Sequence, residues 1–406
     1  MTAALLSLVL SAALDGASLV ASVPITTHVD GSAAPAELRW VIRRDENERG
    51  VVPHDSGWMQ YGETPWLNHH LAVVTNRGGL PSVRWMSSAV ELDGLFVEDG
   101  DVVLRWRGTL TRYVFRGWQL ERSELAPRPS LTKARLAATF ETGLVHLAAV
   151  GDVMVGRATA KALDAVGVEP AFRAAQPIFA RADVRLGNLE SCFSATRRES
   201  AGGLELTAPL RRLDVLRFLR FDALSLANNH CDAEDAAFSR GVLLDAGIVG
   251  TGAEAVRLVG GDGVALLGLN LWPTTAALLD EKLAAKLERA RALAPHVVVL
   301  VHWGDEYAAT PSAAQREAAA WLVAHGATVV LGAHPHVLQA IEQPTQGSLV
   351  AYSLGNFVFD QQGYPTGVGA KTEETVVLEV RMHRTLGVTS RTTRFRITAR
   401  ARLEPR

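Results

Sequence analysis

The 406-residue chain has only two cysteines, Cys192 and Cys231, and no long run of basic residues. Two cysteines cannot form a disulfide framework, so the sequence is compatible with a reducing compartment. The formal net charge is −2 and the basic residues are scattered, which argues against a nucleic-acid-binding surface. Hydrophobic residues make up 48% and charged residues 21% of the chain, a mix typical of a globular protein with a sizeable core.

The N-terminus lacks positive charge, because the first Lys or Arg is Arg39. Residues 3–14 are apolar, but a signal peptide needs a charged segment before its apolar core. A folded strand or helix is therefore favoured here over a signal peptide. The run is also shorter than the about 20 residues that span a bilayer, so no transmembrane segment is expected. The sequence leaves the location open, with the cytoplasm slightly favoured over the cell envelope.

The chain changes character near residue 125. Before it, short runs rich in Val, Thr, Trp and Tyr alternate with glycine-containing turns, a pattern that predicts strands. We therefore expect a β-rich accessory module of β-sandwich type at residues 1–126. A linker is expected at 127–142, because Pro127 and Pro129 interrupt any regular periodicity there.

Residues 143–406 alternate between apolar strand-like runs and helical segments, which predicts an α/β domain with helices covering the sheet. The strand-like runs include HLAAVGD, HVVVLVHWG and ATVVLGAHPH. Single helices are expected at residues 170–183, at 275–294 and over SAAQREAAAWLVAHG.

Side chains that can bind metal follow several of these apolar runs, at the point where each predicted strand ends. The carboxyl ends of strands in open α/β sheets form the crevice where ligands bind. We therefore expect these groups to surround one site. They are Asp152, Asn188, Glu190, Asn228, Asn229, His230, His302, His334 and His336.

The types of these residues indicate the cofactor. Carboxylate and amide oxygens mixed with imidazoles suit manganese, iron or zinc rather than an ion that prefers thiolates. There are more donors than one tetrahedral zinc uses, and a carboxylate can bridge two ions. We therefore expect two divalent metal ions, which together stabilise the attacking and leaving oxygens of a phosphoryl displacement.

The sharpest local motif is His334-Pro335-His336. In an extended segment, residues two apart point to the same side, and proline fixes φ between them. An isolated histidine is more often a core or surface residue, but two of them directly after a buried strand favour metal ligation. The motif therefore predicts two imidazoles that face one metal centre.

Six motifs resemble, in order and spacing, the CapA family named for poly-γ-glutamate capsule biosynthesis, a branch of the calcineurin-like metallophosphoesterases. They cover roughly residues 145–362. The resemblance implies a four-layer αββα sandwich with the metals at the strand ends. The motifs are GDVMVGR, GNLE, LANNH, VHWGDEY, GAHPHVLQ and YSLGNFVFDQ.

The resemblance also implies roles for individual residues. The first metal would be held by Asp152 and His336, and Glu190 would bridge the two ions. The second metal would be held by Asn229, His302 and His334. His230 would act as the acid beside the leaving oxygen, and the ligands would be oriented by Asn188, Asn228 and Asn356.

The chain departs from the ordinary phosphoesterases of this superfamily at Met154, where they have a histidine two residues after the first aspartate. A thioether is a poor ligand for a hard or borderline ion. The first site therefore lacks one expected ligand, although CapA-type sequences commonly share this feature. Cys192 and Cys231 follow Glu190 and His230 closely, and we interpret them as small buried thiols beside the site.

Three functions follow from this sequence. The first is metal-dependent hydrolysis of a phosphate ester, or a related step in capsule polymer synthesis. The second is a non-hydrolytic subunit of an envelope biosynthesis complex, which uses its metals to bind an anionic polymer such as poly-γ-glutamate for synthesis or export. In the third, the β-rich module binds a ligand and the α/β domain is a vestige.

Overall fold

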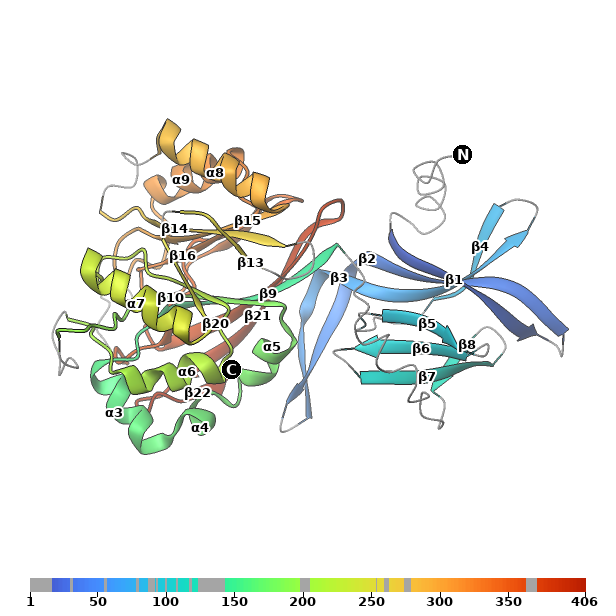
Figure 1. The fold of residues 1–406 in the computed structure, drawn as a ribbon, viewed down its shortest axis with the longest axis horizontal. Coiled ribbons are helices and arrows are strands. Elements are labelled where there is room, and N and C mark those ends of the chain that lie inside the picture. Colours follow the sequence, from blue (N-terminus) through green and yellow to red (C-terminus); the bar gives the residue numbers. More distant parts are fainter. Residues whose placement is uncertain are drawn as a thin grey trace. The chain divides into compact units, whose positions relative to one another are not determined.

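The computed structural model describes residues 17–29, 32–54, 57–77, 80–86, 92, 94–98, 101–106, 109–116, 119–122, 143–197, 205–252, 254–258, 263–273, 279–362 and 371–406 (Figure 1). The apolar segment 3–14 and the predicted linker 127–142 lie outside the described residues. The chain forms two compact units, one within Met1–Asn47 and Pro65–Leu144 and the other within Glu48–Thr64 and Val145–Arg406. The expected end of the β-rich module at residue 126 and the expected start of the α/β domain at residue 143 stay predictions.

The N-terminal part is built from strands, as its sequence predicts. Four strands form one sheet and four form another. The pairs β1–β2, β3–β4, β5–β6, β6–β7 and β7–β8 are antiparallel. Apolar side chains from both sheets share one core, which includes Trp40, Leu71, Leu95 and Val102. The strands are β1 (Ser18–Val29), β2 (Ser32–His54), β3 (Gly57–Arg77), β4 (Leu80–Met86), β5 (Gly94–Glu98), β6 (Asp101–Trp106), β7 (Thr109–Arg116) and β8 (Gln119–Arg122).

The second unit contains an eight-stranded sheet. Its strands are β9 (Leu144–Val153), β10 (Val184–Leu189), β11 (Ala223–Ser225), β12 (Val249–Thr251), β19 (Asn356–Val358), β20 (Glu374–His383), β21 (Gly387–Ile397) and β22 (Leu403–Pro405). The order is β12-β11-β10-β9-β20-β21-β22, with β19 also paired to β9. Strands β9 to β12 and β19 pair in parallel, so the carboxyl ends of β9, β10 and β11 lie at one edge.

A six-stranded sheet packs against the first. Its strands are β13 (Val256–Leu258), β14 (Val264–Asn270), β15 (His296–His302), β16 (Val329–Ala333), β17 (Ile341–Thr345) and β18 (Ser348–Ala351). Strands β14, β15, β16 and β18 are parallel neighbours. Their almost fully buried Val- and Leu-rich sequences are typical of a sheet covered on both faces.

Helices cover the outer faces of both sheets, which gives four layers (Figure 1). Against the eight-stranded sheet lie α3 (Arg157–Val166), α4 (Val168–Phe172), α5 (Gln176–Arg181), α6 (Leu213–Phe218) and α7 (Ala233–Asp245), and the 3-10 turn η1 (Leu210–Arg212) directly precedes α6. Against the six-stranded sheet lie α8 (Glu281–Leu293) and α9 (Ala313–Ala324). Three separate apolar cores fill the helix–sheet, sheet–sheet and sheet–helix layers, so the predicted αββα sandwich is confirmed.

Two predicted helices have the wrong bounds. The segment 170–183 is not one helix, because Pro177 has no backbone N–H and fits only in the first turn of α5, where no such bond is needed. The helix expected at 275–294 corresponds to α8, which begins at Glu281 after the non-helical residues 279–280, and residues 275–278 lie outside the described residues. Asp280 has an extended backbone and its side chain accepts a hydrogen bond from the N–H of Leu283, which makes it the N-cap.

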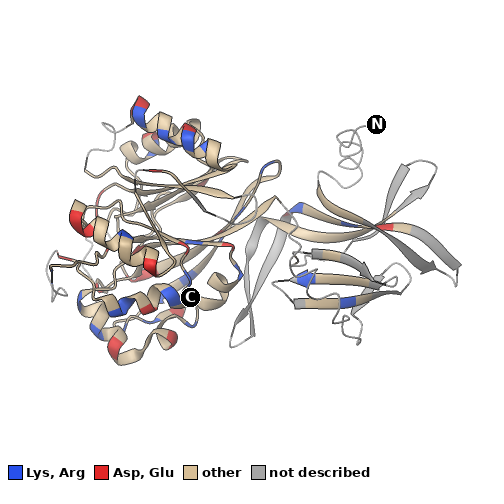
Figure 2. Ribbon diagram, viewed as in Figure 1, with Lys and Arg blue, Asp and Glu red and all other residues tan. Residues whose placement is uncertain are grey.

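Charged residues of both signs are interspersed along the helices of the second unit (Figure 2). No helix among the described residues is both long and apolar enough to cross a bilayer.

The close approach of β16 to β18 depends on Gly332. A Cβ at this position would lie 1.9 Å from the carbonyl oxygen of Tyr352, which also accepts the indole N–H of Trp303 at 2.9 Å. We expect Gly332→Ala to lower the free energy of unfolding by about 3 kcal/mol, measured by urea unfolding. The control is Gly241→Ala in α7, where nothing lies within 4 Å. This change is expected to stabilise the protein by about 0.5–1 kcal/mol, and equal effects of the two substitutions would contradict the account.

Candidate metal centre

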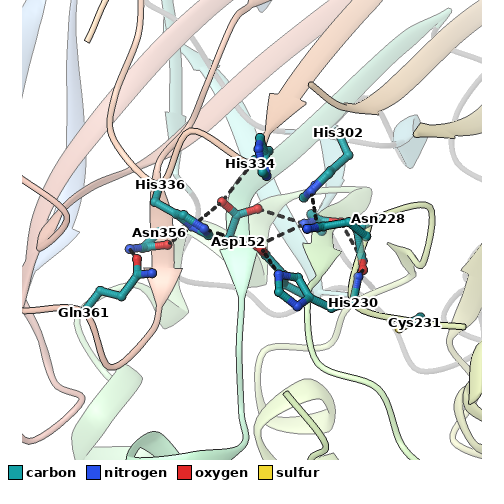
Figure 3. Close-up of polar contacts among 12 residues, drawn as sticks. Asp152, Asn228, His230, Cys231, His302, His334, His336, Asn356 and Gln361 are labelled. Carbon is teal, nitrogen blue, oxygen red and sulfur yellow. Dashed lines mark hydrogen bonds and ion pairs between the residues drawn. The ribbon is translucent and has the colours of Figure 1, made fainter. Parts of the chain in front are cut away.

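The predicted ligands come together where strands of both sheets end. Asp152 lies near the end of β9, and Glu190 directly follows β10. His302 ends β15, and His334 and His336 follow β16. Figure 3 shows Asp152 in the middle, with His336 and Asn356 on one side and His302, Asn228 and His230 on the other.

The ligand atoms form two groups that share one carboxylate. The first contains Asp152, Glu190 and His336, and the second contains Glu190, His302 and His334. Within each group, one ligand atom per residue lies within 4.8 Å of the others, and all five residues are buried. Glu190 therefore belongs to both groups, and its role as a bridge between two ions stays a prediction.

Asn229 and His230 lie on the loop after β11. The side-chain oxygen of Asn229 is 2.8 Å from Nε2 of His302, so it extends the second group. Nε2 of His230 lies 3.4 Å from Oε1 of Glu190, and the imidazole is 16% exposed. His230 can therefore reach both the shared carboxylate and solvent.

Two asparagines hold the loops that carry the carboxylates. The amide nitrogen of Asn188 donates to Oδ1 of Asp152 at 2.8 Å. The amide nitrogen of Asn228 donates to the carbonyl of Leu189 at 2.8 Å, and its oxygen accepts the N–H of His230 at 3.1 Å. These hydrogen bonds join both residues to the segments that carry Asp152, Glu190 and His230, and their role in orienting metal ligands stays a prediction.

Asn356 determines which nitrogen of His336 can bind a metal. Its amide nitrogen donates to Gln361 and to the carbonyl of Thr372, both at 3.1 Å. Its oxygen must then face Nδ1 of His336, 3.0 Å away, and accept a proton from it. The lone pair of His336 is thereby left on Nε2, the nitrogen that lies 3.6 Å from Glu190.

We expect Asn356→Leu to weaken binding of one metal ion about 10- to 100-fold, measured by calorimetric titration with Mn²⁺, because His336 loses its orienting partner. The matched control is Asn356→Asp. Both variants lose the amide donors, but aspartate keeps an acceptor for Nδ1 of His336. Equal losses in the two variants would contradict this role.

The His334-Pro335-His336 segment is not extended as the sequence predicts, although both rings lie among the ligand groups that share Glu190. The φ angles of His334 and His336 are 97° and 58°, in the left-handed region that residues other than glycine rarely adopt. The chain therefore bends at each histidine. The ring centroids lie 6.1 Å apart, and the two rings belong to different ligand groups. Such backbone strain is common at functional sites.

The two buried carboxyl groups have opposite electrostatics. Burial opposes ionisation of Asp152, but a hydrogen bond from His336 and the charges of His336 and His302 outweigh it, so the pKa of Asp152 lies well below its ordinary value. Burial raises the pKa of Glu190 well above its ordinary value, and the neighbouring charge of Asp152 raises it further. Without a compensating cation, this pair cannot readily hold two negative charges.

The histidines of the second group are neutral at neutral pH. Burial holds the pKa of His302 well below its ordinary value, and repulsion between the protonated forms of His302 and His334 lowers it further. Burial and the charge of His336 lower the pKa of His334 to about 4. A neutral imidazole offers a lone pair to a metal.

These residues fit a metal. Among the described residues, Oε1 of Glu190, Nδ1 of His302 and both ring nitrogens of His334 find no hydrogen-bond partner, although all three side chains are buried. Buried polar atoms are rarely left without a partner. A pair of divalent cations would satisfy Oε1 of Glu190 and one ring nitrogen of His334, and would offset the excess carboxylate charge.

Met154 takes no part in either group. It is fully buried and packs with Leu206 and Phe359, and its sulfur accepts the N–H of Gly156 at 3.2 Å. Phe359 in turn lies edge-on against His336, with 4.9 Å between the ring centroids. An apolar cluster thus fills the position where a further ligand was expected.

The two cysteines are not separate thiols. Cys192 and Cys231 form a disulfide, with their Cα atoms 5.6 Å apart, and no free cysteine remains. The interpretation as two small buried thiols was therefore wrong. The two sulfurs meet because β10 and β11 are neighbouring parallel strands, which places the loops that follow them side by side. This strand order cannot be predicted from the sequence alone.

Two residues near the ligands were missed by the sequence analysis: Trp272 lies outside every quoted motif, and Glu306 lies within VHWGDEY but was given no role. Trp272 is 40% exposed, and its ring lies 5.5 Å from that of His334. Glu306 is exposed, and its negative charge acts on both Glu190 and His334.

Comparisons with known proteins identify the family. Residues 146–255 and 266–361 match the family described as bacterial capsule synthesis protein PGA_cap, which is half of the chain. The chain is 30% identical to the PGA biosynthesis protein CapA of Bacillus subtilis over 251 residues, which cover 55% of this chain and 65% of that protein. It is also 30% identical to the capsule biosynthesis protein CapA of Bacillus anthracis over 243 residues, which cover 52% and 59%. The chain thus spans less than two thirds of the length of each relative.

Two solved structures are more distant. A hypothetical protein from Thermus thermophilus has a TM-score of 0.41 and 18% identity, covering 61% of this chain and 99% of that one. A novel phosphatase from Mycoplasma pneumoniae has a TM-score of 0.40 and 12% identity, covering 62% and 93%. At this level of similarity neither structure bears on activity. The family match coincides with the strands that carry the ligand groups, and the chain belongs to the bacterial capsule synthesis protein PGA_cap family.

Proposed function

We propose that the chain is a dinuclear-metal-dependent hydrolase of a phosphate ester that acts in the synthesis of a capsule polymer. The observation that carries this proposal is the pair of ligand groups that share Glu190. A shared carboxylate holds two ions close together, and such a pair stabilises both the attacking and the leaving oxygen of a phosphoryl displacement. In this assignment Asp152, Glu190 and His336 hold one ion, and Glu190, Asn229, His302 and His334 hold the other.

When bound, two such ions would activate a water and stabilise the charge on the phosphate. The chain's own groups supply the rest. His230 lies beside the shared carboxylate and is partly exposed, so Nε2 is placed to donate a proton to a leaving oxygen. Asn188, Asn228 and Asn356 keep the ligand side chains in position through the hydrogen bonds described above.

A non-hydrolytic role is the second candidate. The names of both relatives refer to biosynthesis of PGA or capsule rather than to hydrolysis. The apolar cluster at Met154 also leaves the first ion with fewer ligands than a superfamily phosphoesterase supplies. In this role the metal centre would bind the carboxylates of an anionic polymer within an envelope complex, without turnover.

One experiment separates the two functions. The purified protein is loaded with Mn²⁺, its metal content is measured, and it is assayed with a nitrophenyl phosphodiester and with poly-γ-glutamate. Hydrolysis that disappears on chelation and returns with Mn²⁺ supports the first function. Stoichiometric metal with polymer binding and no turnover supports the second. Absence of stoichiometric metal contradicts both.

A further inference from the structure

The disulfide lies directly beside the proposed catalytic groups. Cys192 is two residues after Glu190, and Cys231 immediately follows His230. The bond therefore joins the loop that carries the shared carboxylate to the loop that carries the proposed acid. Figure 3 shows Cys231 next to His230 at the edge of the polar network.

The Cys192 side of this bond is firmly anchored. Cys192 is 2% exposed, its carbonyl accepts the N–H of Ala208 at 2.8 Å, and it pairs with Thr207 in an isolated β-bridge. The next residue, Phe193, exchanges two hydrogen bonds with the hydroxyl of Ser239 in α7, at 2.9 and 3.1 Å. The loop that carries Cys192 is therefore held in place by backbone and side-chain hydrogen bonds.

The loop with His230 is held at both ends. Asn228 is fixed by its bond to Leu189, and α7 begins after Asp232, whose side chain accepts the N–H of Asp235 at 2.8 Å. Asn229 and His230, which lie between these points, are exposed and partly buried respectively. Here the disulfide adds a third fixed point, and the sulfur of Cys192 lies 3.3 Å from the carbonyl oxygen of His230.

We propose that the Cys192–Cys231 disulfide is a positioning device that holds the His230 imidazole against Glu190. The expected effect of the disulfide on turnover rests on the proposed hydrolase function, whereas its effect on the position of His230 does not. The alternative is that the bond, which joins residues 39 apart, only stabilises the fold by constraining the unfolded chain. A stabilising bond would leave the placement of His230 unchanged.

The first test uses Cys192→Ala, Cys231→Ala and the double variant, each loaded with Mn²⁺. Thiol titration of the native wild-type protein should detect no free thiol, and titration after reduction in denaturant should detect two. Either single substitution breaks the bond, so with an ester that has an alkyl leaving group we expect the three variants to lose the same factor in kcat, about tenfold. KM and metal content are expected to change little, because the ligands stay in place.

The same cysteine substitutions in a His230→Ala background show whether the disulfide affects kcat through His230 or through another part of the site. If the disulfide acts through His230, its removal changes kcat less than about twofold once that imidazole is absent. A full tenfold loss in this background would overturn the proposal, and so would free thiols in the native protein.

A second readout does not depend on activity. Contact with Glu190 shields His230 from diethyl pyrocarbonate, so its modification in the metal-free protein, located by mass spectrometry, should be at least about threefold faster in the cysteine variants. His325, which stacks on Trp321 in α9, is the internal reference and should react at an unchanged rate. If the wild-type protein shows no turnover, the proposed function fails, but the modification rates still decide the positioning role. Unchanged rates at His230 would overturn it.

Discussion

Glu190→Gln is expected to lower bound Mn²⁺ from about two ions per chain to fewer than about 0.5, measured by elemental analysis after gel filtration. Glu190 is the only member common to both ligand groups, so its loss removes a ligand from each site. Glutamine keeps the shape of the side chain but supplies one weak oxygen donor in place of a bridging carboxylate. Hydrolysis of the nitrophenyl diester is expected to be lost together with the metal.

Thermal unfolding separates lost metal binding from lost folding. Burial raises the pKa of Glu190 above its ordinary value of 4.5, so this group contributes less to stability as pH rises through the interval between the two pKa values. Glutamine carries no such penalty. At pH 7 the metal-free variant should therefore unfold at the same temperature as the metal-free wild type, or higher. Added Mn²⁺ should raise Tm of the wild type by mass action but not that of the variant.

Glu306→Gln is the control for charge alone. Glu306 is exposed and its charge acts on Glu190 and His334, but it belongs to neither ligand group. This variant is expected to keep about two ions per chain, with affinity weakened less than about tenfold. If Glu306→Gln loses metal as completely as Glu190→Gln does, the ions are held by the overall negative charge around the site. In that case Glu190 is not a bridging ligand.

The convergence of Asp152, Glu190, His302 and His336 could be predicted because each follows an apolar run of strand-like composition. Parallel strands bring their carboxyl ends to one edge, so the periodicity of the chain is sufficient to gather these residues. The same reasoning predicts the layers, because Val- and Leu-rich strands need covering helices on both faces.

Other features depend on contacts that periodicity does not encode. The pairing of Cys192 with Cys231 requires that β10 and β11 be neighbours, and the sequence does not give strand order. The bends at His334 and His336 are backbone conformations that the surrounding fold imposes. Trp272 carries no motif, and its place beside His334 follows only from the packing of the loop after β14.

His230→Ala is expected to lower kcat with retention of both metal ions, because His230 belongs to neither ligand group. Its Nε2 lies 3.4 Å from Glu190 on the partly exposed side of the site, where a leaving oxygen could accept its proton. For an ester with an alkyl leaving group, loss of a general acid lowers kcat about 10²- to 10⁴-fold. Metal content by elemental analysis shows whether the loss is catalytic or structural.

The dependence on the leaving group distinguishes a proton donor from a residue that merely binds phosphate. Nitrophenolate is stable without a proton, so the same variant should lose only about tenfold or less in kcat with a nitrophenyl diester. A residue that binds the phosphate contacts both substrates alike and would give equal losses. His230→Gln, which can form a hydrogen bond but cannot donate a proton as an acid, should behave like the alanine variant. Equal losses of kcat for the two esters, or recovery of kcat in the glutamine variant, would assign His230 to phosphate binding. The reason is that the contribution of a proton donor to kcat increases with the basicity of the leaving oxygen, whereas that of a phosphate-binding residue does not.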